Sequence, residues 1–239
     1  MNLEILPVRR AGAAENMALD FLLLQRYPRP EAPRFRHYEW PGAAFTFGYA
    51  QKIAFIRGAL PPGERWDLCR RPTGGGIVDH RDDWTYALVI PRGQPLEEVR
   101  AAQSYREVHE CLAEALRAQG VPAVTKQACE PAPDGAGCGP SGVCFQRAEL
   151  YDVVHERSGE KIAGAAQKRN KQGLLFQGSI WRPAVGAAID WDRFHTDFTS
   201  ALARVLDCPA QPTPWPEFNE DEVAGLIEQY SAPEWNEAR

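Results

Sequence analysis

The sequence has no apolar run near the roughly 20 residues that a helix needs to cross a bilayer. Arg, Asp or Pro interrupts each of its longest apolar stretches. The first ten residues hold no apolar core followed by a cleavage site, so we expect no signal peptide and a cytoplasmic protein without a membrane partner. Hydrophobic residues make up 44% and charged residues 25% of the chain, values typical of a globular protein, and they exclude a disordered or fibrous chain.

An excess of positive charge is also missing. The 27 Lys and Arg stand against 32 Asp and Glu, a net charge of −5, so we expect no nucleic-acid partner. Lysine itself is scarce: it supplies five of the 27 basic residues, and three of these five lie within residues 161–171. Each lysine of that segment is therefore a candidate functional residue.

The cysteines do not follow a metal or disulfide pattern. The sequence has no Cys-x-x-Cys pair, and no histidine stands near the middle three cysteines, so a zinc site is only weakly supported. In a 239-residue chain for which we expect no secretory signal, free thiols are favoured over a disulfide framework. The six cysteines are Cys69, Cys111, Cys129, Cys138, Cys144 and Cys208.

Hydrophobic periodicity predicts an α/β (α+β) fold, one mixed, mostly antiparallel sheet packed with helices. We expect a single catalytic domain over residues 1–239. The segment 129–143, rich in Gly and Pro, is predicted to be an irregular loop. The predicted helices are 14–25, 95–119, 192–206 and 220–230, the last capped by Asn219; the predicted strands are 35–40, 43–48, 85–91, 150–155, 161–167 and 174–181.

The sharpest local motif is a glycine turn between two extended segments, Arg70-Arg71-Pro72-Thr73-Gly74-Gly75-Gly76, followed by His80. Glycine N–H groups can approach a ligand closely, and arginine pairs with phosphate or carboxylate. The alternative is a flexible turn with surface arginines. The motif is not a Walker loop, because no Gly-Lys-Ser/Thr follows.

Two further segments carry candidate chemistry. Lys161 begins a strand of small residues that includes Gly164 and Ala165, against which a ligand can lie, and its ammonium could bond a carbonyl or phosphate oxygen. Cys144 follows the glycine-rich loop, where a thiol can be exposed enough to react. A solvated lysine and an inert buried cysteine are the alternatives, and nothing local sets Cys144 apart from Cys129 or Cys138.

Taken together, these motifs resemble the lipoate–protein ligase and octanoyltransferase family, whose catalytic domain is related to biotin–protein ligase. The resemblance runs in order through most of the chain. It rests on Asn16-Met-Ala-Leu-Asp20, Tyr38-Glu-Trp40 with Phe47-Gly48-Tyr49-Ala50-Gln51, the glycine motif from Arg70 to His80, Tyr151-Asp-Val-Val, Lys161-Ile-Ala-Gly-Ala-Ala-Gln167 and Phe176-Gln-Gly-Ser-Ile180.

The resemblance implies one of two reactions. Ligases activate lipoate or octanoate with ATP and Mg, whereas transferases move octanoyl from acyl carrier protein without a nucleotide or other cofactor. In one transferase branch an internal cysteine becomes acylated, and Cys144-Phe145 followed by Tyr151-Asp152 has that branch's spacing. We therefore expect an octanoyltransferase that acylates lysines of lipoyl-domain proteins, such as the glycine cleavage H protein and the 2-oxoacid dehydrogenase E2.

In this reading Cys144 and Lys161 are catalytic, and no metal is expected. Arg70, Arg71, Thr73, Gly74, Gly75, Gly76, His80, Gly164 and Ala165 are the predicted substrate-binding residues. An octanoyl chain buried at about 0.8 kcal/mol per methylene would bind strongly enough to select its length.

Two alternatives stay open, an ATP-dependent lipoate ligase and a non-catalytic acyl-binding module. Phe21 stands where the family often has an acidic residue, and Gln177 where it usually has His. The chain ends soon after Tyr230, so we expect no C-terminal accessory domain of the long ligases.

Overall fold

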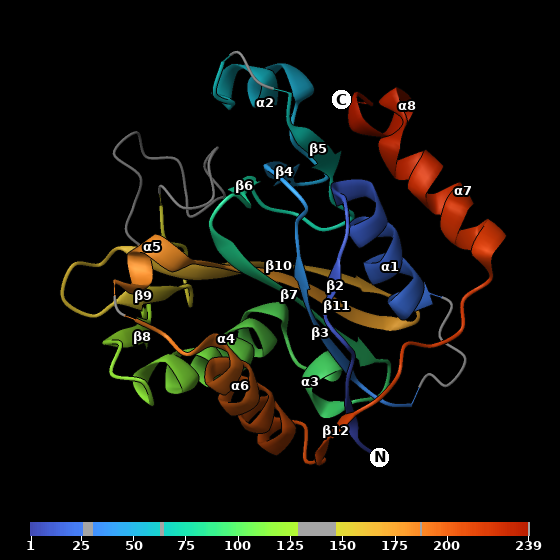
Figure 1. Cartoon of the computed structure of the whole chain (residues 1–239). Coiled ribbons are helices and arrows are strands. Elements are labelled where there is room, and N and C mark those ends of the chain that lie inside the picture. The colour runs from blue at the N-terminus through green and yellow to red at the C-terminus, as the bar shows by residue number, and fades with distance from the viewer. Residues whose placement is uncertain (26–30, 63–64, 129–146, 187, 239) are drawn as a thin grey trace.

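The computed structural model describes residues 1–25, 31–62, 65–128, 147–186 and 188–238. In this part of the chain the strands form a sheet of nine strands and a small sheet of three (Figure 1). The large sheet has the order β12-β1-β3-β7-β11-β10-β9-β8, with β2 beside β3. Its strands are β1 (Leu3–Ile5), β2 (Arg9–Arg10), β3 (Arg34–Glu39), β7 (Asp83–Pro91), β8 (Ala123–Thr125), β9 (Val153–His155), β10 (Lys161–Asn170), β11 (Gly173–Trp181) and β12 (Ala210–Pro212).

In the large sheet, the successive neighbours β3, β7, β11, β10, β9 and β8 pair antiparallel, and β1, β2 and β12 add parallel pairs at the other edge. The predicted mixed, mostly antiparallel sheet is therefore confirmed. The helices are α1 (Ala13–Gln25), α2 (Ile53–Ala59), α3 (Pro95–Glu98), α4 (Ala101–Arg117), α5 (Arg182–Val185), α6 (Trp191–Val205), α7 (Glu220–Ser231) and α8 (Pro233–Asn236). No helix in the described ranges is both long and apolar enough to cross a membrane.

Every residue of β7 is buried, because helices cover both faces of the large sheet. Trp84, Tyr86 and Leu88 point into a core shared with α4 and α6. The alternate residues Ala87 and Val89 belong to a second core with α1 and α7. Figure 1 shows α4 and α6 together on one side of the sheet and α1 and α7 together on the other.

The small sheet carries the glycine turn. It consists of β4 (Ala44–Phe47) between β5 (Asp67–Arg70) and β6 (Ile77–Asp79), and it has its own apolar cluster of Phe45, Phe47, Ile56 and Ile77. The turn that joins β5 to β6 faces the large sheet, since Thr73 donates a hydrogen bond to Gln177 on β11 and Lys168 on β10 donates one to the carbonyl of Pro72. This contact between the two sheets builds the site described below.

Two predicted elements are wrong in their bounds for local reasons, and one helix was not predicted. The helix predicted over 95–119 is broken, because Val99 adopts an extended conformation (ψ 163°) between α3 and α4. The strand predicted over 150–155 begins only at Val153, because Tyr151 lies in the left-handed region (φ 66°). Helix α2 was not predicted. The cap at Asn219 is confirmed: its side chain accepts hydrogen bonds from the N–H groups of Asp221 and Glu222.

Candidate active site

The glycine turn, the start of α4 and the first half of β10 line an open cavity of about 350 Å³. Gly75 and Gly76 form one wall and Tyr105 another. The segment 147–152, just before β9, closes a third side. From β10 the side chains of Lys161, Ala165 and Gln167 line it, so residues far apart in the sequence meet at one hollow.

A buried ion pair lies in the wall of this cavity. The ammonium nitrogen of Lys161 is 2.7 Å from Oδ2 of Asp152, and the two side chains are 5% and 1% exposed. The N–H of Glu149 also donates to Oδ2 of Asp152, at 2.6 Å. A cation at this depth needs such a partner, because the desolvation of an unpaired charge is expensive. The pair therefore fixes the Lys161 ammonium at the cavity.

Tyr105 holds the other oxygen of Asp152. Its hydroxyl donates to Oδ1 of Asp152 at 2.5 Å and accepts the N–H of Ala165 at 2.9 Å. Strand β9 pairs with β10 only as far as Ala163, so the Tyr105 hydroxyl takes the place of a strand partner for Ala165. Tyr105, Asp152 and Lys161 thus form a chain of contacts from helix α4 to the start of β10.

Replacing Tyr105 with phenylalanine is expected to lower the turnover rate of the octanoyl transfer expected from the sequence by about tenfold, with little change in KM, since about 1.4 kcal/mol corresponds to the loss of one hydrogen bond. The aromatic ring, which packs 4.1 Å from that of His109, stays in place. Steady-state kinetics would measure this split. Tyr151→Phe is the matched control, because Tyr151 lines the same cavity and its hydroxyl has no hydrogen bond to any described residue. Equal effects of the two changes would contradict the role of the Tyr105 hydroxyl.

The turn before Asp152 is fixed from the helix side. Its left-handed residue, Tyr151, donates its N–H to the carbonyl of Lys126 and accepts a hydrogen bond from Nδ1 of His109 at 2.7 Å. A non-glycine residue in this conformation is retained only where the surroundings hold it. The His109 ring is fully buried, and this burial lowers its pKa to about 4.

The buried neutral His109 predicts a loss of stability in acid. The unfolded chain binds a proton at this histidine below about pH 6.5, whereas the folded chain binds it only near pH 4. The free energy of unfolding therefore falls as the pH drops through this window, by about 2 kcal/mol between pH 7 and pH 5 from this residue. Urea unfolding at the two pH values should show that His109→Gln reduces this fall by a similar amount. If the difference in stability between wild type and variant is the same at both pH values, His109 is not the source.

The glycine turn is shaped from inside by Arg71. Its guanidinium donates to the carbonyls of Gly74 and Gly76, at 2.6 and 3.0 Å, and to Oγ1 of Thr46 at 3.1 Å. Gly75, with a φ of 89°, occupies a conformation that side chains with a Cβ rarely adopt. Arg71 is therefore buried and bonded to the protein in this structure, and its predicted contact with substrate stays a prediction.

Arg70 also points inward. It is 1% exposed, and its guanidinium donates to the carbonyls of Tyr49 and Gln51, and of Trp235 and Asn236 near the end of the chain. These contacts place it beneath the glycine turn, outside the residues that line the cavity. A substrate contact of Arg70 stays a prediction.

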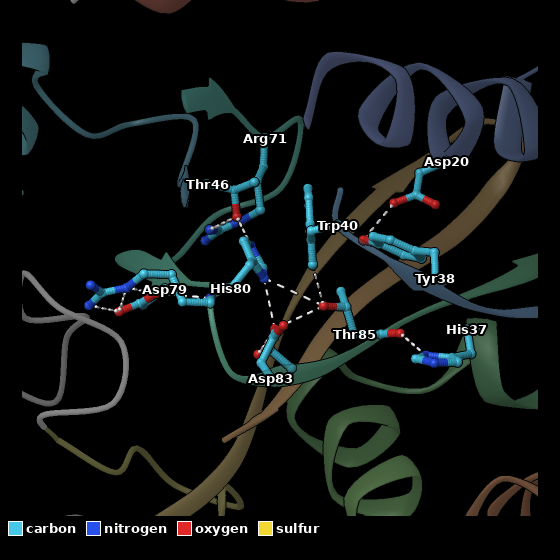
Figure 2. Close-up of polar contacts among 12 residues, drawn as sticks. Asp20, His37, Tyr38, Trp40, Thr46, Arg71, Asp79, His80, Asp83 and Thr85 are labelled. Carbon is cyan, nitrogen blue, oxygen red and sulfur yellow. Dashed lines mark hydrogen bonds and ion pairs between the residues drawn. The ribbon is translucent and has the colours of Figure 1, made fainter. Parts of the chain in front are cut away.

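A narrower slot of about 30 Å³ lies next to the main cavity, with Gly75 and Ala165 in the walls of both. Its floor includes Gly164 and its far wall His80. Figure 2 shows His80 held from both sides: Nε2 is 2.7 Å from Oγ1 of Thr46, and Nδ1 is 2.7 Å from Oδ2 of Asp83. The His80 ring also stacks on Trp40, and this fixes its orientation in the slot wall.

The two departures from the family pattern have structural partners. Gln177 accepts a hydrogen bond from Thr73 at 2.7 Å and donates one to Asp20 at 2.6 Å, so it ties the glycine turn to α1. Burial raises the pKa of Asp20, although its ion pair with Arg36 opposes this shift. Phe21 packs edge-on against Tyr230 of α7.

The cysteines divide into two groups. The described ones, Cys69, Cys111 and Cys208, are free thiols and buried, as predicted for the chain. Burial raises the pKa of Cys111 to about 12, so this thiol is unreactive. The catalytic candidate Cys144 lies outside the described residues, as do Cys129 and Cys138. Cys144 precedes Arg147, which lines the cavity, by three residues.

The structure brings most of the other predicted residues together. Lys161, Gly75, Gly76 and Ala165 line the main cavity, and His80 and Gly164 line the slot beside it. Sequence reasoning missed Asp152 as the partner of Lys161, although it lay in the quoted Tyr-Asp pair. It also missed Tyr105, which carries no motif. Within the described residues, no group of three or more His, Cys, Asp or Glu is arranged to hold a metal ion.

Solved structures with this architecture exist. The bipartite lipoate protein ligase of Thermoplasma acidophilum, analysed with its E2 lipoyl domain, superposes with a TM-score of 0.72 at 18% identity, over 99% of this chain and 96% of that one. The sheet and its helices give this chain the lipoate-ligase-like fold.

The family follows from the sequence comparison. The model of the lipoyl protein ligase A/B catalytic domain matches residues 12–182, and the chain belongs to this family. It is 33% identical over 174 residues to the octanoyltransferase LipM of Bacillus cereus, a segment that spans 72% of this chain and 62% of that protein. It is 25% identical over 268 residues to LipM of Kyrpidia tusciae, with 97% of each chain covered. The predicted family and fold class are confirmed.

Proposed function

We propose that the chain is an octanoyltransferase that moves octanoyl from the thiol of acyl carrier protein to a lysine of lipoyl-domain proteins through a thioester on Cys144. The observation that carries the proposal is the Lys161 ammonium, held by Asp152 in the wall of a cavity next to the glycine turn. The relatives named octanoyltransferase support the same reaction. The T. acidophilum ligase with its E2 lipoyl domain supports a lipoyl domain as the acceptor.

The first step exchanges one thioester for another. The Cys144 thiolate attacks the octanoyl carbonyl, a C–S bond forms and the carbonyl oxygen becomes an oxyanion. When this intermediate collapses, the bond to the carrier sulfur breaks, and the carrier leaves as a thiolate that takes up a proton. Both thioesters have similar energy, so this step needs no nucleotide. A positive charge beside the cavity favours both the attacking thiolate and the oxyanion, and this is the role we assign to Lys161.

The second step forms the stable product. The neutral amine of the acceptor lysine attacks the Cys144 thioester, a C–N bond forms and the C–S bond breaks. The amine nitrogen loses one proton, and the Cys144 thiolate is regenerated. An amide is more stable than a thioester, so this step makes the transfer irreversible. The ion pair with Asp152 keeps the Lys161 charge at the same place for both oxyanions.

Mass spectrometry after mixing with octanoyl-acyl carrier protein tests the proposal. Without ATP, we expect an octanoyl adduct on this chain that hydroxylamine removes and that passes to an apo lipoyl domain. The adduct should be absent in Cys144→Ser and present in the matched control Cys138→Ser. An adduct that survives Cys144→Ser would refute the nucleophile.

The same experiment with ATP and Mg separates the alternatives. Lipoate-dependent release of pyrophosphate, with no adduct from the carrier protein, would instead assign a lipoate ligase. Tight binding of octanoate or lipoate without turnover on a lipoyl domain would assign an acyl-binding module. Either result overturns the transferase.

A further inference from the structure

The end of the chain is fastened to the start of the glycine motif. Asn236 of α8 accepts the backbone N–H of Arg70 on its side-chain oxygen at 2.7 Å, and its carbonyl accepts the Arg70 guanidinium at 2.8 Å. Trp235 accepts the same guanidinium at its carbonyl, 3.0 Å, and its indole N–H donates to the carbonyl of Arg70 at 2.8 Å. Four hydrogen bonds therefore join α8 to one residue of β5.

The same arginine holds a second segment. Its guanidinium donates to the carbonyls of Tyr49 and Gln51 at 2.7 and 2.8 Å. The Tyr49 N–H in turn donates to the carbonyl of Thr73 at 2.8 Å, and the Gln51 amide donates to the carbonyl of Gly75 at 3.2 Å. Arg70 thus lies between α8 and two of the residues that bond the glycine turn, Tyr49 and Gln51.

The glycine turn receives little side-chain packing at its exposed tip, Gly74. A Cβ built on Gly74 would meet no atom within 4 Å, and Gly74 is exposed. Hydrogen bonds hold its carbonyls instead: Arg71 bonds those of Gly74 and Gly76, and Gln51 bonds that of Gly75. A turn held in this way changes shape when its hydrogen-bonding supports move.

We propose that Asn236 is a positioning residue for the glycine turn, which it reaches through Arg70 and Gln51. Helix α8 lies beyond the family-matched residues 12–182, yet it supports the family's glycine motif. Figure 1 shows α8 beside β5, the strand of the small sheet that leads into the glycine turn. The kinetic part of this inference rests on the proposed transferase function, and the structural part does not.

Hydrogen exchange measured by mass spectrometry tests the structural part. Asn236→Ala should speed exchange in the peptide that covers 71–79 by about tenfold, the factor expected for the loss of a buried hydrogen bond. Gln51→Met, which removes only the last link, should have a similar effect. The matched control is Arg57→Ala, which breaks the exposed pair of Arg57 with Glu237 and leaves Arg70 untouched; it should leave this peptide unchanged.

A double-mutant cycle separates positioning from local stability. The Asn236 side chain bonds the N–H of Arg70, and the guanidinium of the same arginine bonds the carbonyl of Gln51. If both residues act on the turn through Arg70, the double variant should exchange about as fast as either single variant. In kinetics, each single variant should raise KM for the octanoyl donor about fivefold more than it lowers kcat, because Gly75 and Gly76 of the turn line the cavity proposed to hold the substrate. Faster exchange confined to residues 230–238, or additive effects on residues 71–79, would overturn the inference. Absence of transfer in the wild type would refute the proposed function. The exchange result alone would then decide whether Asn236 positions the glycine turn.

Discussion

Replacing Lys161 with methionine is expected to lower the rate of octanoyl transfer by about 100- to 1,000-fold, the range for the loss of one group that stabilises an oxyanion. Methionine matches the length of the lysine stem and removes only the charge and the hydrogen bonds. The variant should also unfold more easily, by about 3 kcal/mol, because Asp152 stays buried without its cation. The Asp152 side chain is 1% exposed, so water cannot take the place of the lysine ammonium beside it.

A second substitution separates the two effects. In Lys161→Met/Asp152→Asn an uncharged amide replaces the buried carboxylate. The asparagine oxygen can accept the N–H of Glu149, and the asparagine NH2 group can donate to the hydroxyl oxygen of Tyr105. Stability measured by urea unfolding should return to within about 1 kcal/mol of the wild type. Activity should stay as low as in the single variant. A double variant that regains transfer, or a Lys161→Met that keeps more than a tenth of the rate, would show that the ammonium is not needed.

The main helices and strands could be predicted because their apolar residues recur at helical spacing or form continuous runs in the sequence. Helix α1 was predicted to within one residue of its observed start, and β7 was predicted as a buried strand over 85–91 because apolar residues follow one another there. The sequence did not predict the break at Val99, since the residues on both sides still fit one helical face. Edge strands of two or three residues, such as β2 and β12, carry too few side chains for any period to appear.

The site was predictable only where a residue type carries its own chemistry. Lys161 and the glycine turn stood out by scarcity and by three consecutive glycines. The partners of Lys161 did not, because an Asp nine residues earlier and a Tyr in a distant helix become neighbours only through the tertiary fold. The sequence also could not show that Arg70 and Arg71 are buried, since arginine motifs look the same whether they bind carbonyl groups of the chain or a ligand.

Adding one methyl group at Gly164 is expected to abolish most of the activity while the protein stays folded. A Cβ at this position would lie 2.7 Å from both Cε and Nζ of Lys161 and 3.0 Å from Oδ1 of Asp152. Because Gly164, the fourth residue of β10, has no side chain, the Lys161 ammonium can occupy the space above it and reach Asp152. Because Cε and Nζ are the far end of a flexible side chain, they can move aside, and the backbone need not shift.

The Gly164→Ala variant should therefore separate stability from catalysis. We expect transfer to fall by about 100-fold, since the ammonium leaves the place where the oxyanion forms. The free energy of unfolding should change by only about 1 kcal/mol, because a weaker ion pair is partly offset by the lower backbone entropy of alanine in the unfolded chain. Kinetics and urea unfolding on the same preparation measure both. Gly58→Ala is the matched control: a Cβ on Gly58, in helix α2, meets no atom within 4 Å, so this change should leave transfer unaltered. If Gly164→Ala keeps full activity, the position of the Lys161 ammonium seen here is not the one that the reaction uses.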